Sequence, residues 1–262
     1  AVQYGVCCEP SMTGAAAKAS FDFAEWSVDA LLRPREPRHA FLAALEEARA
    51  AQLPYPVLNC FIPGDLKITG PAVDASALRK YAETAFERAE QAGVEVIVFG
   101  SGSARRIPDG FDSEAAHGQL ADFCAMIAPL ALRRGVTVAL EPLNRRECNV
   151  LTTVAECAAL VREVAHPGLG LLTDSFHLMI DGDSCEDVAA NGGILRHAHI
   201  ATVPNRLAPG AEPCDFAPFF GALARGGYRG RISIEGHIPA PEKDLPAAFK
   251  LMRGLAQGRA VG

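Results

Sequence analysis

Apolar and small or polar residues alternate in the run VTVALE at residues 136–141, and this pattern predicts a β-strand. The two valines and the leucine share one face, while Thr137, Ala139 and Glu141 share the other. Pro142 follows directly, and proline tends to end a strand because it has no N–H to donate. A carboxylate therefore lies at the carboxyl end of a predicted strand.

Similar short apolar runs recur along the chain and are separated by alanine-rich or amphipathic segments. Strands are predicted at residues 3–7, 22–26, 56–59, 94–99, 136–141, 168–174, 195–200 and 229–235. Helices are predicted at residues 12–19, 38–52, 74–91, 113–134, 154–164, 185–190, 215–225 and 241–257. Asp74 is the expected N-cap of its helix, and Gly93 the expected stop.

Strands that alternate with helices must pair in parallel through right-handed crossovers. Eight such units in 262 residues predict an α/β fold, a closed (β/α)8 TIM barrel, as one domain over residues 1–262. The alternative is an open doubly wound sheet. That fold would place a glycine-rich phosphate loop after the first strand, and GVCCEPS at residues 5–11 does not have that pattern.

Four consecutive predicted strands end in residues that commonly bind metal ions: Glu141, Asp174, His199 and Glu235. Barrel enzymes carry their active residues at these strand ends, and the alternation places all four side chains inward. Each residue alone is also typical of a helix cap, an ion pair or a core histidine. Together they would repel strongly without a cation, so we predict a divalent metal ion. The oxygen-rich set favours Mn²⁺, with Mg²⁺, Co²⁺ or Zn²⁺ as alternatives.

The composition disfavours nucleic-acid-binding and membrane-spanning proteins. The formal net charge of −6 disfavours a nucleic-acid surface, and no apolar run predicts a membrane span. The eight cysteines form no CxxC pair, which is typical of reduced thiols in a cytoplasmic protein. We therefore expect a small-molecule partner, a sugar or polyol, and leave a homo-oligomer open.

Four segments in order, ALEPLNRRE, LLTDSFH, HAHIATVPNR and ISIEG, resemble the xylose-isomerase-like barrel superfamily, the sugar isomerase/epimerase group. The resemblance to its ketose 3-epimerases implies metal ligands at the four strand ends named above. It also implies substrate contacts from Glu147, His177 and Arg206. Arg206 is one residue further from its histidine than in those epimerases.

A metal-dependent isomerase or epimerase acting on a ketose or keto-sugar is the expected function. Glu141 and Glu235 would transfer the proton, and the divalent ion would stabilise the enediolate. The alternative is a keto-inositol (inosose) dehydratase or related lyase on the same barrel. A more remote alternative, the superfamily's abasic-site DNA endonuclease, needs further histidines after strands two to four, and the sequence has none there. A non-catalytic sugar-binding barrel is disfavoured because all four metal-type residues are present.

Two further features keep two interpretations each. The loop at residues 100–106 would bind an anionic or hydroxylated group, or be a flexible polar loop. Trp26 would pack in the core or stack on a sugar. Lys67, in the loop after the third strand, is a candidate lid or substrate contact, and His237 is predicted to line the mouth of the barrel. The absence of a glycine-rich loop after strands seven and eight favours an unphosphorylated substrate.

Overall fold

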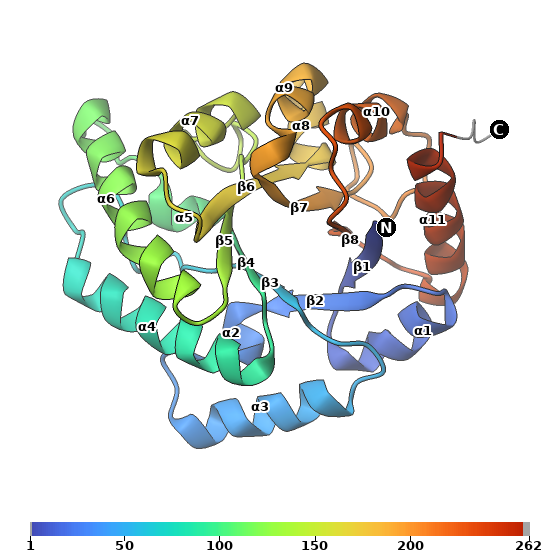
Figure 1. Cartoon of the computed structure of the whole chain (residues 1–262), viewed down its shortest axis with the longest axis horizontal. Helices are drawn as coiled ribbons and strands as arrows, with labels where there is room; N and C mark the ends of the chain where they lie inside the picture. The colour runs from blue at the N-terminus through green and yellow to red at the C-terminus, as the bar shows by residue number, and fades with distance from the viewer. Residues whose placement is uncertain (1, 259–262) are drawn as a thin grey trace.

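In the computed structural model, which describes residues 2–258, eight parallel strands close into a barrel in the order β1 to β8 (Figure 1). The strands are β1 (Gln3–Cys7), β2 (Phe23–Ser27), β3 (Val57–Asn59), β4 (Val96–Phe99), β5 (Thr137–Leu140), β6 (Leu169–Asp174), β7 (Leu195–Ile200) and β8 (Arg231–Ile234). Pairing of β1 with β8 completes the ring. The predicted (β/α)8 fold is confirmed, and the open-sheet alternative is wrong.

Helices surround the barrel on its outside (Figure 1). They are α1 (Thr13–Lys18), α2 (Val28–Leu31), α3 (Arg38–Ala50), α4 (Ala75–Ala92), α5 (Gly102–Arg105), α6 (Ser113–Leu132), α7 (Val154–Val164), α8 (Ser175–Asp181), α9 (Cys185–Ala190), α10 (Ala217–Arg225) and α11 (Pro241–Ala256). Two short 3₁₀ segments cover Pro10–Met12 and Gly192–Ile194. The eight predicted helices are present, with ends shifted by a few residues. The short helices α2, α5 and α8 follow strand ends and were not predicted.

Local capping explains where several helices begin and end. Asp74 accepts a hydrogen bond from the Ala77 N–H at 2.9 Å, and Gly93 ends α4 with φ of 75°. The left-handed conformation at that position suits glycine, as predicted. Asp174 caps α8 in the same way, through the Phe176 N–H at 2.8 Å. This cap fixes the backbone at the end of β6.

One helix, α6, is long and apolar enough to cross a membrane by length and composition alone. In the structure it packs against α4, α7 and β5, with its buried side chains facing the barrel. A core helix of this kind passes the same length and composition test.

Two apolar layers hold the barrel. The larger one lies between the strands and the helices. The interior is filled by a smaller cluster of Phe23, Val57, Val96, Val98, Ala139 and Leu172. Because strand residues alternate, Glu141 and Asp174 point inward two positions beyond Ala139 and Leu172. Their carboxylates therefore lie above the apolar interior, at the carboxyl ends of the strands.

We expect Gly5→Ala to lower the free energy of unfolding by about 1–3 kcal/mol. A Cβ at Gly5 would lie 2.3 Å from the ring of Phe23, the largest side chain in the barrel interior. Urea unfolding measures the change. Gly118→Ala is the control, because nothing lies within 4 Å of its Cβ position on the exposed side of α6. It should leave stability unchanged or raise it. Equal effects of the two substitutions would contradict the packing argument.

Candidate active site

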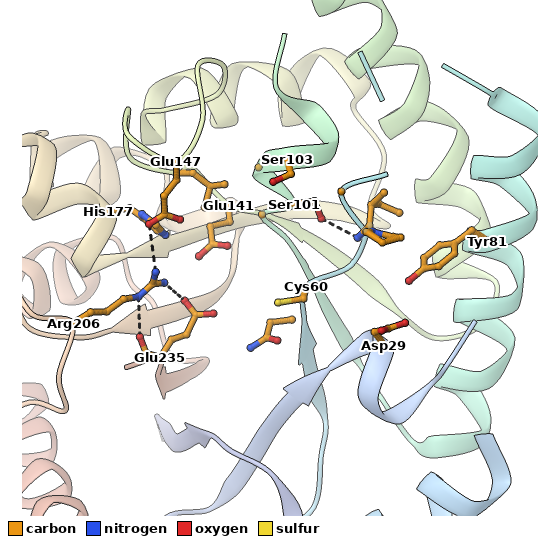
Figure 2. Close-up of a pocket in the computed structure, with 17 residues that line it drawn as sticks. Asp29, Cys60, Tyr81, Ser101, Ser103, Glu141, Glu147, His177, Arg206 and Glu235 are labelled. Carbon is orange, nitrogen blue, oxygen red and sulfur yellow. Dashed lines mark hydrogen bonds and ion pairs between the residues drawn. The ribbon is translucent and has the colours of Figure 1, made fainter. Parts of the chain in front are cut away.

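A cavity of about 470 Å³ opens where the strands end (Figure 2). Glu141, His177, Arg206 and Glu235 line one side of it, from the ends of β5, β6, β7 and β8. Two carboxylates, an imidazole and a guanidinium therefore face the same cavity. The cavity thus brings residues from distant parts of the sequence to a common point, as the strand-end pattern predicts.

Three carboxylates meet on this side. One ligand atom from each of Glu141, Asp174, His177 and Glu235 lies within 4.8 Å of the others. Asp174 is buried, and its Oδ2 has no hydrogen-bond partner among the described residues. His177 Nε2 and the Arg206 guanidinium are each 3.6 Å from that oxygen. An unpartnered buried carboxylate oxygen is costly, and a bound cation would remove that cost.

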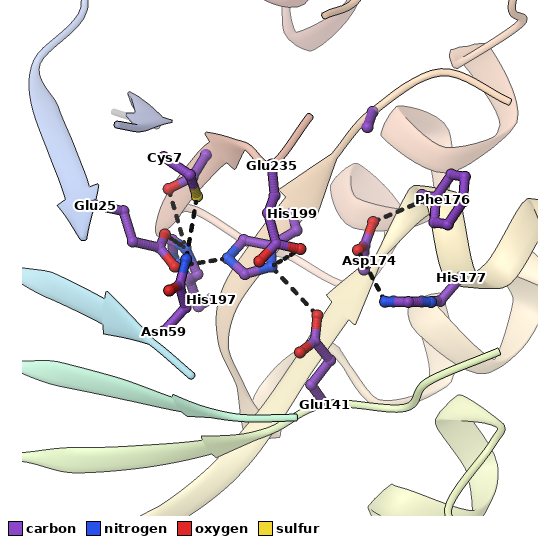
Figure 3. Close-up of polar contacts among 12 residues, drawn as sticks. Cys7, Glu25, Asn59, Glu141, Asp174, Phe176, His177, His197, His199 and Glu235 are labelled. Carbon is purple, nitrogen blue, oxygen red and sulfur yellow. Dashed lines mark hydrogen bonds and ion pairs between the residues drawn. The ribbon is translucent and has the colours of Figure 1, made fainter. Parts of the chain in front are cut away.

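His199 lies on the other side of the carboxylates, fully buried (Figure 3). Its Nδ1 is 3.3 Å from Glu141 Oε1 and 3.4 Å from Glu235 Oε2. Its Nε2 is 3.0 Å from Glu25 Oε1. Burial acts to lower the pKa of His199, but Glu25 and Glu235 outweigh it and raise this pKa well above its usual value, so without a metal both ring nitrogens carry protons. A cation would displace the Nδ1 proton between the two glutamates while Nε2 keeps donating to Glu25. This orientation suits a metal ligand.

His177 presents the opposite tautomer. Its Nδ1 accepts a hydrogen bond from the Asn144 N–H at 3.2 Å, so the neutral ring carries its proton on Nε2. That N–H faces Asp174, 3.6 Å away, and the cavity (Figure 3). His177 therefore acts as a hydrogen-bond donor, although its distance alone would also allow it to be a ligand.

Arg206 crosses the cavity mouth and contacts the acidic residues on both sides. It lies 2.5 Å from Glu235 Oε2 and 3.5 Å from Glu147 Oε1, and its guanidinium packs over the Phe176 ring. Asn144 Nδ2 donates to the same Glu147 oxygen at 2.9 Å. Arg206 has a left-handed backbone, with φ of 52°, and its side chain lines the cavity. The guanidinium thus reaches the site.

The environment moves the pKa values of the two glutamates in opposite directions. Burial raises the pKa of Glu141, and the nearby Glu235 adds to this effect, while a hydrogen bond from His199 opposes it. Burial also acts to raise the pKa of Glu235, but His199 and Arg206 outweigh it and lower this pKa to about 2. Burial and Glu235 raise the pKa of Asp174 to about 6. Paired carboxyl groups with separated pKa values are typical of acid–base sites.

Cys7 also faces this centre, within 4.8 Å of ligand atoms of His199 and Glu235. Burial, reinforced by the charge of Glu25, raises the pKa of the Cys7 thiol well above its usual value. The thiol is therefore protonated near neutral pH, and only the thiolate is a strong metal ligand.

The loop at residues 100–106 lines the cavity with Ser101, Gly102 and Ser103, so its binding of a hydroxylated group stays a prediction, while Arg105 has a structural role. Arg105 is fully buried and donates to the carbonyl oxygens of Phe99, Glu141 and Leu151. It therefore fixes the backbone of Glu141 and does not bind an anion. A Cβ at Gly100 would lie 2.4 Å from Glu141 Oε2, so a larger residue there would displace the Glu141 carboxylate.

The contacts of Trp26, Lys67 and His237 show where these three residues lie relative to the cavity. Trp26 packs against the core near Tyr55, so the core interpretation holds. Lys67 Nζ donates to the carbonyls of Gly64 and Ser103 and ties two loops together. His237 is exposed and does not line the cavity, contrary to the expectation.

Sequence reasoning missed Glu25 and Asn144. Glu25 is fully buried in β2, and its second oxygen is 2.9 Å from His197 Nε2 (Figure 3). Burial acts to raise the pKa of Glu25, but His199 and His197 outweigh it and lower the pKa well below its usual value. The signal was its alternation with Phe23, which places a carboxylate on the inward face of a strand. Asn144 has no comparable pattern.

Residues 14–255 match the model of a family described as xylose isomerase-like TIM barrel. The chain is 34% identical over 148 residues to a ketose 3-epimerase of Arthrobacter globiformis, covering 55% of this chain and 48% of the relative. It is 34% identical over 179 residues to an L-ribulose 3-epimerase of Methylomonas sp. strain DH-1, covering 65% of this chain and 59% of the relative. A 3-dehydro-D-guloside 4-epimerase of Escherichia coli K12 is 30% identical over 124 residues, 47% of each chain. The chain thus spans about half the length of the curated relatives it matches.

Solved structures share the fold over nearly the whole chain. A crystal structure of D-psicose 3-epimerase in the presence of D-fructose has a TM-score of 0.83 at 19% identity, covering 97% of this chain and 99% of that one. A 3-keto-D-glucoside 4-epimerase from E. coli has a TM-score of 0.75 at 23% identity, covering 98% of this chain and 100% of that one. The family match extends over most of the barrel. The chain belongs to the xylose isomerase-like TIM barrel family.

Proposed function

We propose that this protein is a divalent-metal-dependent isomerase or epimerase that acts on a ketose or keto-sugar. The observation that carries the proposal is the convergence of Glu141, Asp174 and Glu235, with His199 Nδ1 at 3.3 Å from Glu141 Oε1 and 3.4 Å from Glu235 Oε2. The named activities of the relatives, which include ketose 3-epimerases and a guloside 4-epimerase, support the same class of reaction.

The donor set fits a divalent cation. Glu141, Asp174, His199 and Glu235 would hold it, because the three carboxylates supply oxygen ligands and Asp174 Oδ2 has no other partner. Mn²⁺ is the favoured ion for this mixture of carboxylate and imidazole. When bound, the cation stabilises the negative charge that develops at the substrate carbonyl after proton loss.

The protein's own residues divide the remaining work. Glu235, with its lowered pKa, is ionised and suited to remove the proton next to the carbonyl. Glu141, with its raised pKa, is suited to return one, and the reverse reaction exchanges the two roles. The His177 Nε2–H and Arg206 bind substrate oxygens, and Glu147, held by Asn144, orients a hydroxyl.

The decisive experiment follows deuterium in D₂O. Mn²⁺-loaded protein is incubated with a panel of ketoses and inososes, and the products are examined by NMR. We expect deuterium on the carbon next to the carbonyl, without loss of water. Loss of water would select the dehydratase alternative, and no exchange with any substrate would refute the proposal.

Glu141→Gln and Glu235→Gln should each lower turnover by on the order of 10²–10⁴, because each keeps its shape and loses its base. Their affinity for Mn²⁺ should fall only modestly. Asp174→Asn should act through lost metal, so excess Mn²⁺ should restore part of its activity. Glu46→Gln, an exposed position in α3, is the control. If excess Mn²⁺ restores Glu235→Gln to near wild type, Glu235 is a ligand only.

Glu25→Gln should lower the affinity for Mn²⁺ by about 10- to 100-fold, the usual effect of removing an outer-shell carboxylate behind a histidine ligand. Glu25 accepts from both His197 and His199, whereas a glutamine offers one acceptor oxygen and no charge. Titration of Mn²⁺ by electron paramagnetic resonance measures the change.

Ser233→Ala is the matched control for that substitution. The Ser233 hydroxyl is 3.1 Å from His197 Nε2, so its loss disturbs His197 and leaves the contact between Glu25 and His199 intact. It should change Mn²⁺ affinity much less. Wild-type affinity in a folded Glu25→Gln protein would show that Glu25 does not orient the ligand.

Without metal, Asp174 should cost stability at neutral pH. Burial raises its pKa from 3.8 to about 6, so the folded state holds this proton more tightly than the unfolded state. This destabilisation is absent at pH values below the pKa of Asp174 in the unfolded chain, and it is complete at pH values above the pKa of Asp174 in the folded protein. In EDTA, Asp174→Asn should therefore gain stability over wild type as the pH rises from about 4 to about 7, by up to roughly 3 kcal/mol. Urea unfolding measures this, and Asp122→Asn should show no such trend.

A further inference from the structure

The cavity continues well beyond the predicted metal ligands. Figure 2 shows Glu141, His177, Arg206 and Glu235 together on one side, Asp29 and Tyr81 on the other, and Cys60 between them. A ketohexose has about twelve non-hydrogen atoms, which together need less than ~360 Å³ even at the volume of one water each. The cavity of about 470 Å³ therefore has room past a single sugar for the nearer part of a substituent.

The far end has two polar groups without partners. Tyr81, from α4, is only 5% exposed, and its hydroxyl has no hydrogen-bond partner among the described residues. Figure 2 shows that hydroxyl directed toward the cavity and Asp29. Asp29, in the first turn of α2, is exposed to solvent at the same end of the cavity and forms no hydrogen bond or ion pair within residues 2–258. Buried hydroxyls are nearly always hydrogen-bonded, so the Tyr81 hydroxyl lacks a partner that a ligand would supply.

The wall around these groups is held in place by hydrogen bonds. Lys67 Nζ donates to the carbonyls of Gly64 and Ser103, at 2.6 and 2.9 Å, and joins the β3–α4 loop to α5. The Ile62 N–H donates to Ser101 Oγ at 2.9 Å across the same junction. The far end is therefore preformed, as ligand sites usually are.

The chemistry of this end favours hydroxyl groups over anions. The two cations nearby are already bound: Lys67 to the two carbonyls, and Arg35 to Asp65 at 2.8 Å. Asp29 would repel a phosphate or carboxylate. A carboxylate and a phenol bind sugar hydroxyls well, and Ile62 and Pro63 give the cavity an apolar wall for a ring.

We infer that the cavity accepts a keto-sugar carrying a second hydroxylated ring away from its carbonyl, and that Asp29 and Tyr81 bind hydroxyls of that ring. This inference rests on the proposed function for the orientation of the sugar. The carbonyl end faces the predicted metal ligands, and the substituent extends past Cys60 toward α2 and α4.

The test compares fructose with 6-O-α-glucosyl-fructose as substrates of the Mn²⁺-loaded protein. We expect a higher kcat/KM for the disaccharide. Tyr81→Phe and Asp29→Asn should each lower the ratio of kcat/KM for disaccharide over fructose by about 3- to 10-fold, the effect of one hydrogen bond. Tyr4→Phe, which lies outside the cavity, should leave that ratio unchanged. Equal kcat/KM values for the two sugars, or ratios that neither cavity variant changes, would overturn the inference.

Calorimetric binding of both sugars separates this inference from the proposed reaction. If neither sugar is turned over, yet the disaccharide binds more tightly than fructose and Tyr81→Phe removes the difference, the second-ring site stands and the proposed reaction is wrong. If fructose is turned over and the disaccharide binds no better, the reaction stands and the second-ring site is wrong. Preference for fructose 6-phosphate over the disaccharide would also overturn the assignment of a neutral, hydroxylated substituent.

Discussion

The crowding of Glu141, Asp174 and Glu235 at the carboxyl ends of three strands is the constraint on which the site depends. Like charges this close and this buried repel, so each needs a positive or donating neighbour. His199 lies against the two glutamates, and Arg206 lies against Glu235 and near Asp174. Asp174 Oδ2 nevertheless has no hydrogen-bond partner in the described chain. The compensation within the protein is incomplete, which is the physical reason for proposing a cation.

A second level of buried polar groups supports this arrangement from below. Glu25 joins the rings of His197 and His199, and beneath it the barrel interior holds an apolar cluster that includes Phe23 and Leu172. From the other direction, the buried Arg105 fixes the Glu141 carbonyl. The apolar layers supply the stability that lets the mouth of the barrel keep its costly charges. A site with unmet charge on a well-packed scaffold is the usual trade between stability and function.

The sequence predicts what strict alternation determines and misses what depends on distant contacts. A strand has a period of two, so the inward direction of Glu141 and Asp174 follows from their neighbours alone. The burial of Arg105 could not be predicted in this way, because its partners are carbonyls of three separate segments. Short helices such as α2 (Val28–Leu31) carry too few residues to show a helical period. The unpartnered hydroxyl of Tyr81 becomes visible only when α4 is placed beside the cavity.

The two ends of the cavity are built from different parts of the barrel. Groups proposed for the reaction lie at strand ends, where the closed sheet fixes their positions. The far end of the cavity comes instead from α2, α4, α5 and the loop after β3, which the sheet does not constrain. Such segments can change while the strand ends stay as they are, so one metal-binding arrangement can serve substrates of different length. The reaction class is therefore best inferred from the strands, and the substrate from Asp29, Tyr81 and the hydrogen bonds of Lys67 that hold their wall in place.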